Sequence, residues 1–197
     1  MEWPDLSAGD FAPVVIPQNS WYVFDLTHKY DPEFIMSKRW GIGRYDERRE
    51  AMYTAPQYEG KRNIHMGIDF WAPAGTPVHA FDDGEVVYTA DHNQKGNYGP
   101  TIVTRHEPAD LTLYALHGHL SRASLEAVKP GDVLEKGAVF AAIGTYWENG
   151  GWAPHLHFQL SRKDPGKADM PGVVAQTERE EALKRYPDPR IVLGNLY

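Results

Sequence analysis

The chain contains no cysteine, which excludes disulfide bonds, thiolate metal sites and cysteine nucleophiles. Any metal site must therefore draw its ligands from histidine, aspartate or glutamate. Basic residues are outnumbered, with 20 Lys and Arg against 27 Asp and Glu and a formal net charge of -7. A nucleic-acid-binding module should be basic or carry a basic stripe, so we expect no nucleic-acid partner.

Long apolar runs are missing as well. No stretch approaches the roughly 20 residues that a membrane-spanning helix needs, so we expect no membrane partner. The first five residues, Met1–Asp5, lack a basic region followed by an apolar stretch and so differ from a secretory signal. The sequence therefore predicts a cytoplasmic protein.

The patterning divides the 197 residues into three parts. Residues 1–60 are irregular but rich in aromatic side chains, so we expect an extension packed on the main domain rather than a disordered tail. Residues 61–162 carry short apolar runs separated by Gly, Pro and Asp turn signals about every 8–12 residues, which is typical of an all-β domain. Residues 163–197 return to loops with one helix. The predicted fold class is mainly β.

The elements expected from these patterns can be given by range. In the central part they are strands at 67–70, 77–80, 84–90, 100–106, 111–117, 139–143 and 156–160, with one or two helical turns at 121–128. In the extension they are short strands at 14–16 and 21–26 and a short helix at 46–52. The last is a helix over Glu178–Arg185, which Pro187 and Pro189 end.

Five of the nine histidines fall in three groups that could carry chemistry. The first group is His65 with Asp69. Four residues apart, they would share a helical face, but Gly67 opposes a helix. We therefore interpret them as a loop histidine and an aspartate at a strand start that converge on one point. Alone, this spacing is common by chance.

The second group is the run from His155 to Leu160, in which polar and apolar residues alternate. In a strand, His155, His157 and Gln159 face one way and the three apolar residues face the core. The third group, His117 and His119, lies at the end of an expected strand, and its two rings should also share a face. For each group the alternative is an ordinary polar strand face or a structural histidine.

The combination indicates more than its parts. In a chain without cysteine, two histidines and one aspartate form a suitable ligand set for a catalytic zinc ion with one position left for water. Mn, Co or Ni would also bind such a set. Two further histidines would supply proton transfer and oxyanion stabilisation.

These motifs resemble the signature of the M23 family of zinc metallopeptidases, the lysostaphin and LytM type. The resemblance covers about residues 61–162, and all motifs follow the family's order. The segments that carry it are His65-x-x-x-Asp69 with Gly67-Ile68-Asp69-Phe70, Ala72 to Val78, Gly84 to Val87, Tyr114 with His119-Leu120-Ser121, Val128 to Gly144, and His155-Leu156-His157-Phe158.

The resemblance implies roles for five residues. His65, Asp69 and His157 would be the zinc ligands, and His119 and His155 the catalytic pair. It also implies a largely antiparallel β-sheet or sandwich crossed by a groove that holds the metal. The implied function is a zinc-dependent hydrolase of a peptide or amide bond. A zinc enzyme acting on a small intracellular metabolite and a non-catalytic M23-like binding module are the alternatives.

Some segments depart from the family's usual pattern. Gln159 stands where members often have Glu, and 41–49, 97–100 and 186–189 resemble a subgroup found as modules of intracellular proteins, some fused to phosphotransferase and class III aminotransferase domains. This subgroup puts cell-wall substrates in doubt and favours a peptide or small-molecule substrate. We expect segment 41–49 to border the groove. Candidate substrate-binding residues are Arg44, Tyr45, Arg48 and Trp152, with an ion pair to Glu47 or Asp46 as the alternative role of the arginines.

Overall fold

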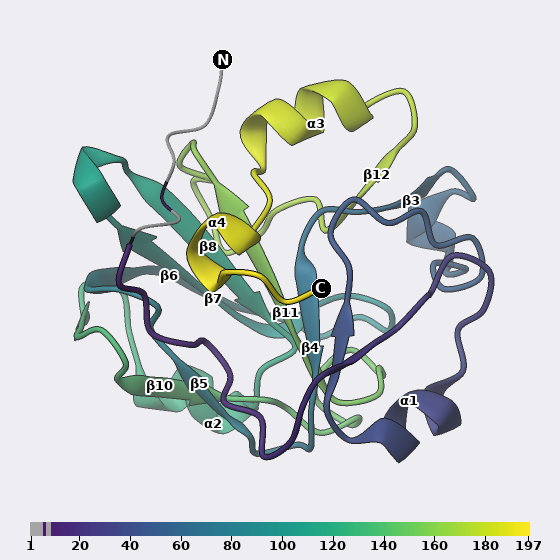
Figure 1. Ribbon diagram of the computed structural model, residues 1–197, viewed down its shortest axis with the longest axis horizontal. Helices are drawn as coiled ribbons and strands as arrows, with labels where there is room; N and C mark the ends of the chain where they lie inside the picture. Colours follow the sequence, from purple (N-terminus) through teal and green to yellow (C-terminus); the bar gives the residue numbers. More distant parts are fainter. Residues whose placement is uncertain (1–5, 7–8) are drawn as a thin grey trace.

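The computed structural model describes residue 6 and residues 9–197, and its centre is one eight-stranded sheet (Figure 1). The segment Met1–Asp5, on which the expectation about a secretory signal depends, lies outside the described residues. The strand order is β1-β2-β4-β11-β8-β7-β6-β9. Every neighbouring pair in this sheet is antiparallel except β1 and β2.

The strands of the large sheet are β1 (Tyr22–Val23), β2 (Gly41–Gly43), β4 (Ile68–Trp71), β6 (Gly84–His92), β7 (Gly99–His106), β8 (Leu113–Gly118), β9 (Val133–Leu134) and β11 (His155–Ser161). Two small sheets pair β5 (Pro77–His79) with β10 (Val139–Ala142) and β3 (Arg62–His65) with β12 (Val173–Ala175). The helices are α1 (Pro32–Lys38), α2 (Arg122–Ala127), α3 (Arg179–Arg185), α4 (Arg190–Leu193) and the 3-10 turns η1 (Pro56–Tyr58) and η2 (Pro108–Asp110).

The predicted fold class is confirmed. Each of the seven strands expected in the central part is present, with ends shifted by one or two residues, and α2 and α3 match the expected helical segments. In β11 the apolar half of the alternation, Leu156, Phe158 and Leu160, is fully buried in the main hydrophobic cluster. The polar half, His155 to Gln159, is buried on the other face, where the site described below lies.

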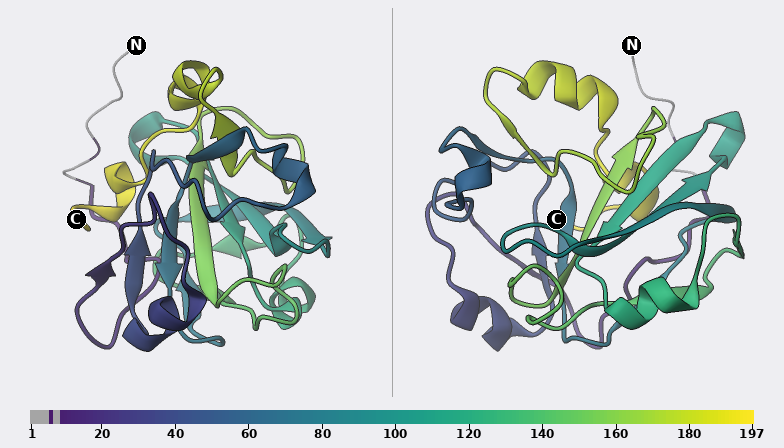
Figure 2. Two further views of the ribbon diagram at one scale, coloured as in Figure 1. Left: turned by 90° about the vertical axis from the view of Figure 1, so that its right-hand side faces the viewer. Right: turned by 180° about the vertical axis from the view of Figure 1, so that it is seen from behind.

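The N-terminal extension adds to this sheet instead of forming a separate layer. β2 pairs with β4, so that Gly43 lies opposite Asp69, and β1 continues the sheet beyond β2. Trp21 packs against Trp40 and Phe70, with ring centroids 5.9 and 5.4 Å apart. Figure 2 shows the purple extension and the yellow C-terminal residues on the same side of the molecule.

Two elements expected in the extension are absent from the structure. Residues 14–16 form no strand, and 46–52 form no helix. The reason for the second difference is tertiary, because the backbone of 46–49 hydrogen-bonds to strand β3. Asp46 and Arg49 donate to the carbonyls of His65 and Asn63, and His65 donates to that of Glu47. These bonds replace the helical ones that a local pattern predicts.

Among the described residues, no helix has the length and apolar character needed to cross a lipid bilayer.

The expectation that His117 and His119 share a face is wrong. His117 points into the core, where its ring lies 4.9 Å from that of Phe140 and 5.3 Å from that of Phe158. His119 follows the end of β8 with a positive φ of 63°, and this left-handed backbone turns its side chain to the other face. Its ring lies 4.2 Å from that of His155.

The buried ring of His117 should make the fold sensitive to acid. Burial lowers its pKa from 6.5 to about 3. Between these pH values the unfolded chain binds a proton that the folded chain does not, so stability falls as the pH drops through this window. At pH 5 the loss from this ring is about 2 kcal/mol.

We therefore expect His117→Leu to lose about 2 kcal/mol less unfolding free energy than the wild type between pH 7 and pH 5. Urea unfolding at the two pH values measures this difference. His28→Leu, which replaces an exposed ring, is the matched control and should keep the wild-type slope. Equal slopes in His117→Leu and wild type would mean that this ring is protonated in the fold.

Candidate metal centre

Strands β4 and β11 of the large sheet and β3 of a small sheet bring the candidate ligands together at the polar face of the large sheet. β11 pairs with β4 so that His157 lies directly opposite Asp69, and with β8 so that it also lies opposite Gly118. His65 ends β3, which the short connection through Gly67 joins to β4. All three side chains are nearly inaccessible to solvent. The structure thus brings together the His65, Asp69 and His157 set that the resemblance implies.

The three donor atoms form a nearly equilateral triangle. His65 Nε2 lies 3.0 Å from His157 Nδ1 and 3.1 Å from Asp69 Oδ1. The remaining side, from His157 Nδ1 to Asp69 Oδ1, is 3.1 Å. Tetrahedral ligands at zinc distances of about 2.0–2.1 Å would be about 3.3 Å apart, so the triangle has nearly the size that zinc requires.

Hydrogen bonds fix which nitrogen of each ligand ring is free. His65 Nδ1 donates to the carbonyl oxygen of Arg44 at 2.8 Å, which leaves the Nε2 lone pair free. His157 Nε2 donates to Gln159 Oε1 at 3.1 Å. The Gln159 amide nitrogen points to the carbonyl of Pro171, so its oxygen is the end that meets the histidine. His65 Nε2, His157 Nδ1 and Asp69 Oδ1 thus point their lone pairs at one another with no hydrogen atom between them. Such a set of acceptors fits a cation.

Burial favours the protonation states that metal ligands need. Desolvation, with the positive charge of Arg49, lowers the pKa of His65 to about 4, so the ring is neutral near pH 7. For Asp69, burial opposes ionisation most strongly. The positive charge of Arg49, whose Nη1 donates to Asp69 Oδ2, outweighs it and holds the pKa of Asp69 well below its usual value.

Two more histidines face the same point with their Nε2 atoms free. His119 Nδ1 donates to the carbonyl of Asn149, and His155 Nδ1 donates to that of Ala153, each at 2.8 Å. His155 Nε2 lies 3.9 Å from Asp69 Oδ1. Burial lowers the pKa of His155 to about 4 and that of His119 well below its usual value. Both rings therefore offer a lone pair, rather than a proton, to a molecule bound beside the metal ligands.

The second oxygen of Asp69 is held by an arginine from the extension. Arg49 Nη1 donates to Asp69 Oδ2 at 2.6 Å, and Arg49 Nε donates to Glu47 Oε2 at 2.9 Å. The Arg49 side chain is fully buried. A Cβ on Gly43 would lie 2.7 Å from Arg49 Nη2, so this position needs glycine for the close approach. The contact leaves Asp69 Oδ1 as the oxygen that faces the histidine nitrogens.

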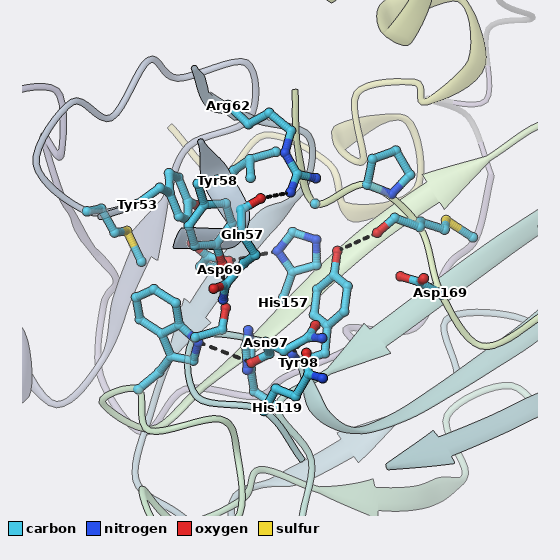
Figure 3. Close-up of a pocket in the computed structure, with 18 of the residues that line it drawn as sticks. Tyr53, Gln57, Tyr58, Arg62, Asp69, Asn97, Tyr98, His119, His157 and Asp169 are labelled. Carbon is cyan, nitrogen blue, oxygen red and sulfur yellow. Dashed lines mark hydrogen bonds and ion pairs between the residues drawn. The ribbon is translucent and has the colours of Figure 1, made fainter. Parts of the chain in front are cut away.

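A cavity of about 530 Å³ opens over these groups. Asp69, His119, His155 and His157 form part of its lining, and Figure 3 shows Asp69 and His157 between Arg62 at the top and His119 at the bottom. The remaining wall residues include Tyr53, Tyr58, Asn97, Tyr98 and Trp152. Tyr98 is fixed by its hydroxyl, which donates to the Met170 carbonyl at 2.9 Å.

The four candidate substrate-binding residues occupy different positions. Trp152 lines the cavity, whereas Arg44, Tyr45 and Arg48 are not among its lining residues. Arg44 pairs with Glu47 at 2.7 Å, which is the ion pair that the sequence offers as the alternative. Tyr45 bonds to the Tyr186 carbonyl, and the exposed Arg48 pairs with Glu50. Segment 41–49, which we expected to border the groove, contributes no residue to the cavity lining, but it contacts the ligand side chains through Gly43, the Arg44 carbonyl and Arg49.

Sequence reasoning missed Arg49, Tyr53 and Tyr98. Arg49 lies in the segment 46–52 for which the sequence predicts a helix, and no sequence pattern indicates its contact with the candidate ligand Asp69. Tyr53, whose hydroxyl accepts a bond from Arg49 at 3.1 Å, was one of eleven aromatics in the extension. No local pattern distinguishes these residues, because each acts through a contact with a distant segment. The available signals are glycine at position 43 and the resemblance of segments 41–49 and 97–100, which contain Arg49 and Tyr98, to the intracellular subgroup.

We expect Arg49→Met to destabilise the metal-free protein by about 3–5 kcal/mol, because Glu47 and Asp69 would lose their buried counter-charge. Urea unfolding at pH 7 measures the change. Arg48→Met, which removes an exposed charge one position earlier, is the matched control and should have little effect. Adding Glu47→Gln to Arg49→Met should restore part of the loss. An Arg49→Met protein as stable as the wild type would contradict the ion-pair interpretation.

Comparison with known proteins gives a family match over the residues that build this site. The model of Peptidase family M23 matches residues 63–171. The DD-carboxypeptidase/endopeptidase Mpg of Neisseria meningitidis is 33% identical over 134 residues, covering 61% of this chain and 28% of that protein. The peptidoglycan DD-endopeptidase ShyA of Vibrio cholerae is 38% identical over 96 residues, covering 49% of this chain and 20% of that protein.

Among solved structures, the catalytic domain of lysostaphin from Staphylococcus simulans is 21% identical, with a TM-score of 0.47, and the match covers 78% of this chain and 99% of that one. The chain spans less than a third of the length of the two curated relatives. The family model covers more than half of the chain, including His65, Asp69, His119, His155 and His157. On this evidence the chain belongs to peptidase family M23.

Proposed function

We propose that the protein is a zinc-dependent metallohydrolase that cleaves a peptide or amide bond. The observation that carries this proposal is the triangle of His65 Nε2, Asp69 Oδ1 and His157 Nδ1, with sides of 3.0–3.1 Å, beside a cavity that Asp69 and His157 line. Membership of peptidase family M23 and the similarity to the two endopeptidases described above support the same reaction class.

The ligand chemistry favours zinc. Two neutral imidazoles and one carboxylate are the donors that catalytic zinc sites use, with a further position left for water or substrate. When bound there, zinc supplies Lewis-acid chemistry that polarises a carbonyl oxygen and makes water nucleophilic near neutral pH. Mn, Co and Ni accept the same donors and are the competing ions.

The two remaining histidines would handle the proton. Because both Nδ1 atoms donate to backbone carbonyls, both Nε2 atoms are acceptors at rest. We propose that His155 takes the proton of the attacking water. Its ring lies 4.2 Å from that of His119, and like charges at that separation repel, so only one ring holds the proton at a time. His119 would stabilise the oxyanion or protonate the leaving amine only as a cation.

The finer assignments remain proposals. We propose that the chain belongs to the intracellular module subgroup and works in the cytoplasm on a peptide or small-molecule substrate. The segments that suggest the subgroup all touch the site, since the Arg44 carbonyl fixes His65 and Asn97, Tyr98 and Tyr186 line the cavity. Fractionation of cells that express the tagged full-length protein tests the location.

Purified protein should bind about one zinc ion per chain. His65→Ala, Asp69→Ala and His157→Ala should each abolish that binding, because each removes one corner of the donor triangle. Metal analysis after dialysis measures the content, with His28→Ala as the control for loss of an exposed histidine. Full zinc content in the Asp69→Ala protein would remove Asp69 from the ligand set.

His155→Ala and His119→Ala should keep zinc but lose about 10²–10⁴-fold in turnover, the usual contribution of a general acid–base group. His117→Leu, a change in the core, is the control and should keep activity. The assay panel sets peptidoglycan fragments and short peptides against small amides and amino-acid derivatives. Cleavage of small metabolites alone would favour the metabolite enzyme, and zinc binding without any cleavage would favour a binding module.

A further inference from the structure

The charge on the cavity wall is opposite to that of the whole protein. The chain has a formal net charge of -7. Away from the metal ligands, however, the lining contains three cations, Arg62, Lys167 and Arg185, and one acid, Asp169. The cavity is therefore a locally positive region in an acidic protein, and such a region attracts anions.

Two of the three cations lack a carboxylate partner within residue 6 and residues 9–197. Lys167 Nζ pairs with Asp169 Oδ2 at 2.9 Å, which neutralises the single acid on this wall. Among the described residues, neither Arg62 nor Arg185 forms an ion pair. Asp69 does not offset them either, because its outer oxygen is bonded to Arg49. The wall thus carries about two uncompensated positive charges.

Aromatic rings orient both guanidinium groups. Arg62 lies 5.7 Å from the centre of the Tyr58 ring and donates to the Gln57 carbonyl. Arg185 lies 5.4 Å from the centre of the Tyr186 ring, and its Nε is buried with no hydrogen-bond partner among the described residues. A half-buried arginine that lies over a ring keeps its remaining N–H groups available, and the planar guanidinium suits the oxygens of a carboxylate.

We propose that Arg62 and Arg185 form a subsite for an anionic group, a carboxylate or phosphate, carried by the substrate. This inference rests on the proposed hydrolase function, since it takes the cavity to be the substrate site. Arg62 begins the strand that His65 ends, three residues and about 10 Å along the chain. An extended substrate has about the same rise per residue, so the anion would lie about three residues from the bond that is cleaved.

The two arginines lie just outside the segment that the family model matches. Arg62 precedes and Arg185 follows residues 63–171, to which the family model is matched. Their partners Tyr58 and Tyr186 also lie outside that range. The family core therefore supplies the metal ligands and catalytic histidines, while residues that flank it in the sequence supply the groups that select the substrate.

The test compares three N-acetylated probes in which charge is the main variable: trialanine with a free carboxylate, its C-terminal amide, and an alanine–phosphoserine–alanine amide. Binding to zinc-loaded full-length protein is measured calorimetrically in the His155→Ala background, which limits turnover. We expect the carboxylate or the phosphate probe to bind at least about 10-fold tighter than the amide, as charge-assisted hydrogen bonds do. Which of the two binds tighter identifies the anion.

The variants are Arg62→Gln, Arg185→Gln and the double change, each checked for zinc content. Each single change should reduce the preference for the anionic probe, and the double change should abolish it. Arg48→Gln removes the same charge outside the cavity and should leave the preference intact. An equal affinity for all three probes would overturn the proposal. So would a preference that survives the double change, because the anion would then be bound by the metal.

Turnover separates this inference from the proposed function. Anion binding that depends on the two arginines, in a protein that cleaves no peptide or amide, would leave the subsite standing and overturn the hydrolase. Cleavage of the acid and the amide probe with equal kcat/KM would leave the hydrolase standing and overturn the subsite.

Discussion

The buried ion pair between Arg49 and Asp69 is the contact on which the rest of the site depends. An unpaired carboxylate at that depth would be protonated or would seek a different partner. Arg49 keeps it charged, occupies one oxygen and so presents the other to the two histidine nitrogens. The carboxylate of Glu47 in turn accepts a hydrogen bond from Arg49 Nε. Because Glu47 and Arg49 both belong to the extension, the family core and the extension share one electrostatic unit.

The part of the site that the sequence predicts is the part that follows from strand geometry. The alternation in β11 places His155 and His157 on one face and Leu156 and Phe158 in the core, as the period of two requires. The resemblance to the family adds His65, Asp69 and His119, which no spacing rule alone would select. These five side chains do meet, although their roles in binding and catalysis stay predictions until they are measured.

What the sequence could not predict depends on contacts between distant segments or on single backbone angles. The local pattern of residues 46–49 predicts a helix, but their backbone hydrogen-bonds to β3 instead. This pairing places Arg49 beside Asp69. His117 and His119 are two residues apart, which in a strand places both side chains on one face. The positive φ of His119 turns its side chain to the opposite face. Arg185, at the end of α3, reaches a cavity whose other wall is built more than 100 residues earlier in the sequence.

The hydrogen bonds of the four histidines lead to a constraint on catalysis. Each ring has one nitrogen bonded to a carbonyl or amide oxygen, so each presents one lone pair to the site. Two lone pairs suit the metal and two remain as bases, and burial keeps the pKa values of those two low. A proton released from water therefore enters a site that has no acid of its own at rest. The most direct acceptor for this proton is the leaving amine. Burial, which keeps the resting histidines unprotonated, would therefore favour transfer of the proton taken from water to the product.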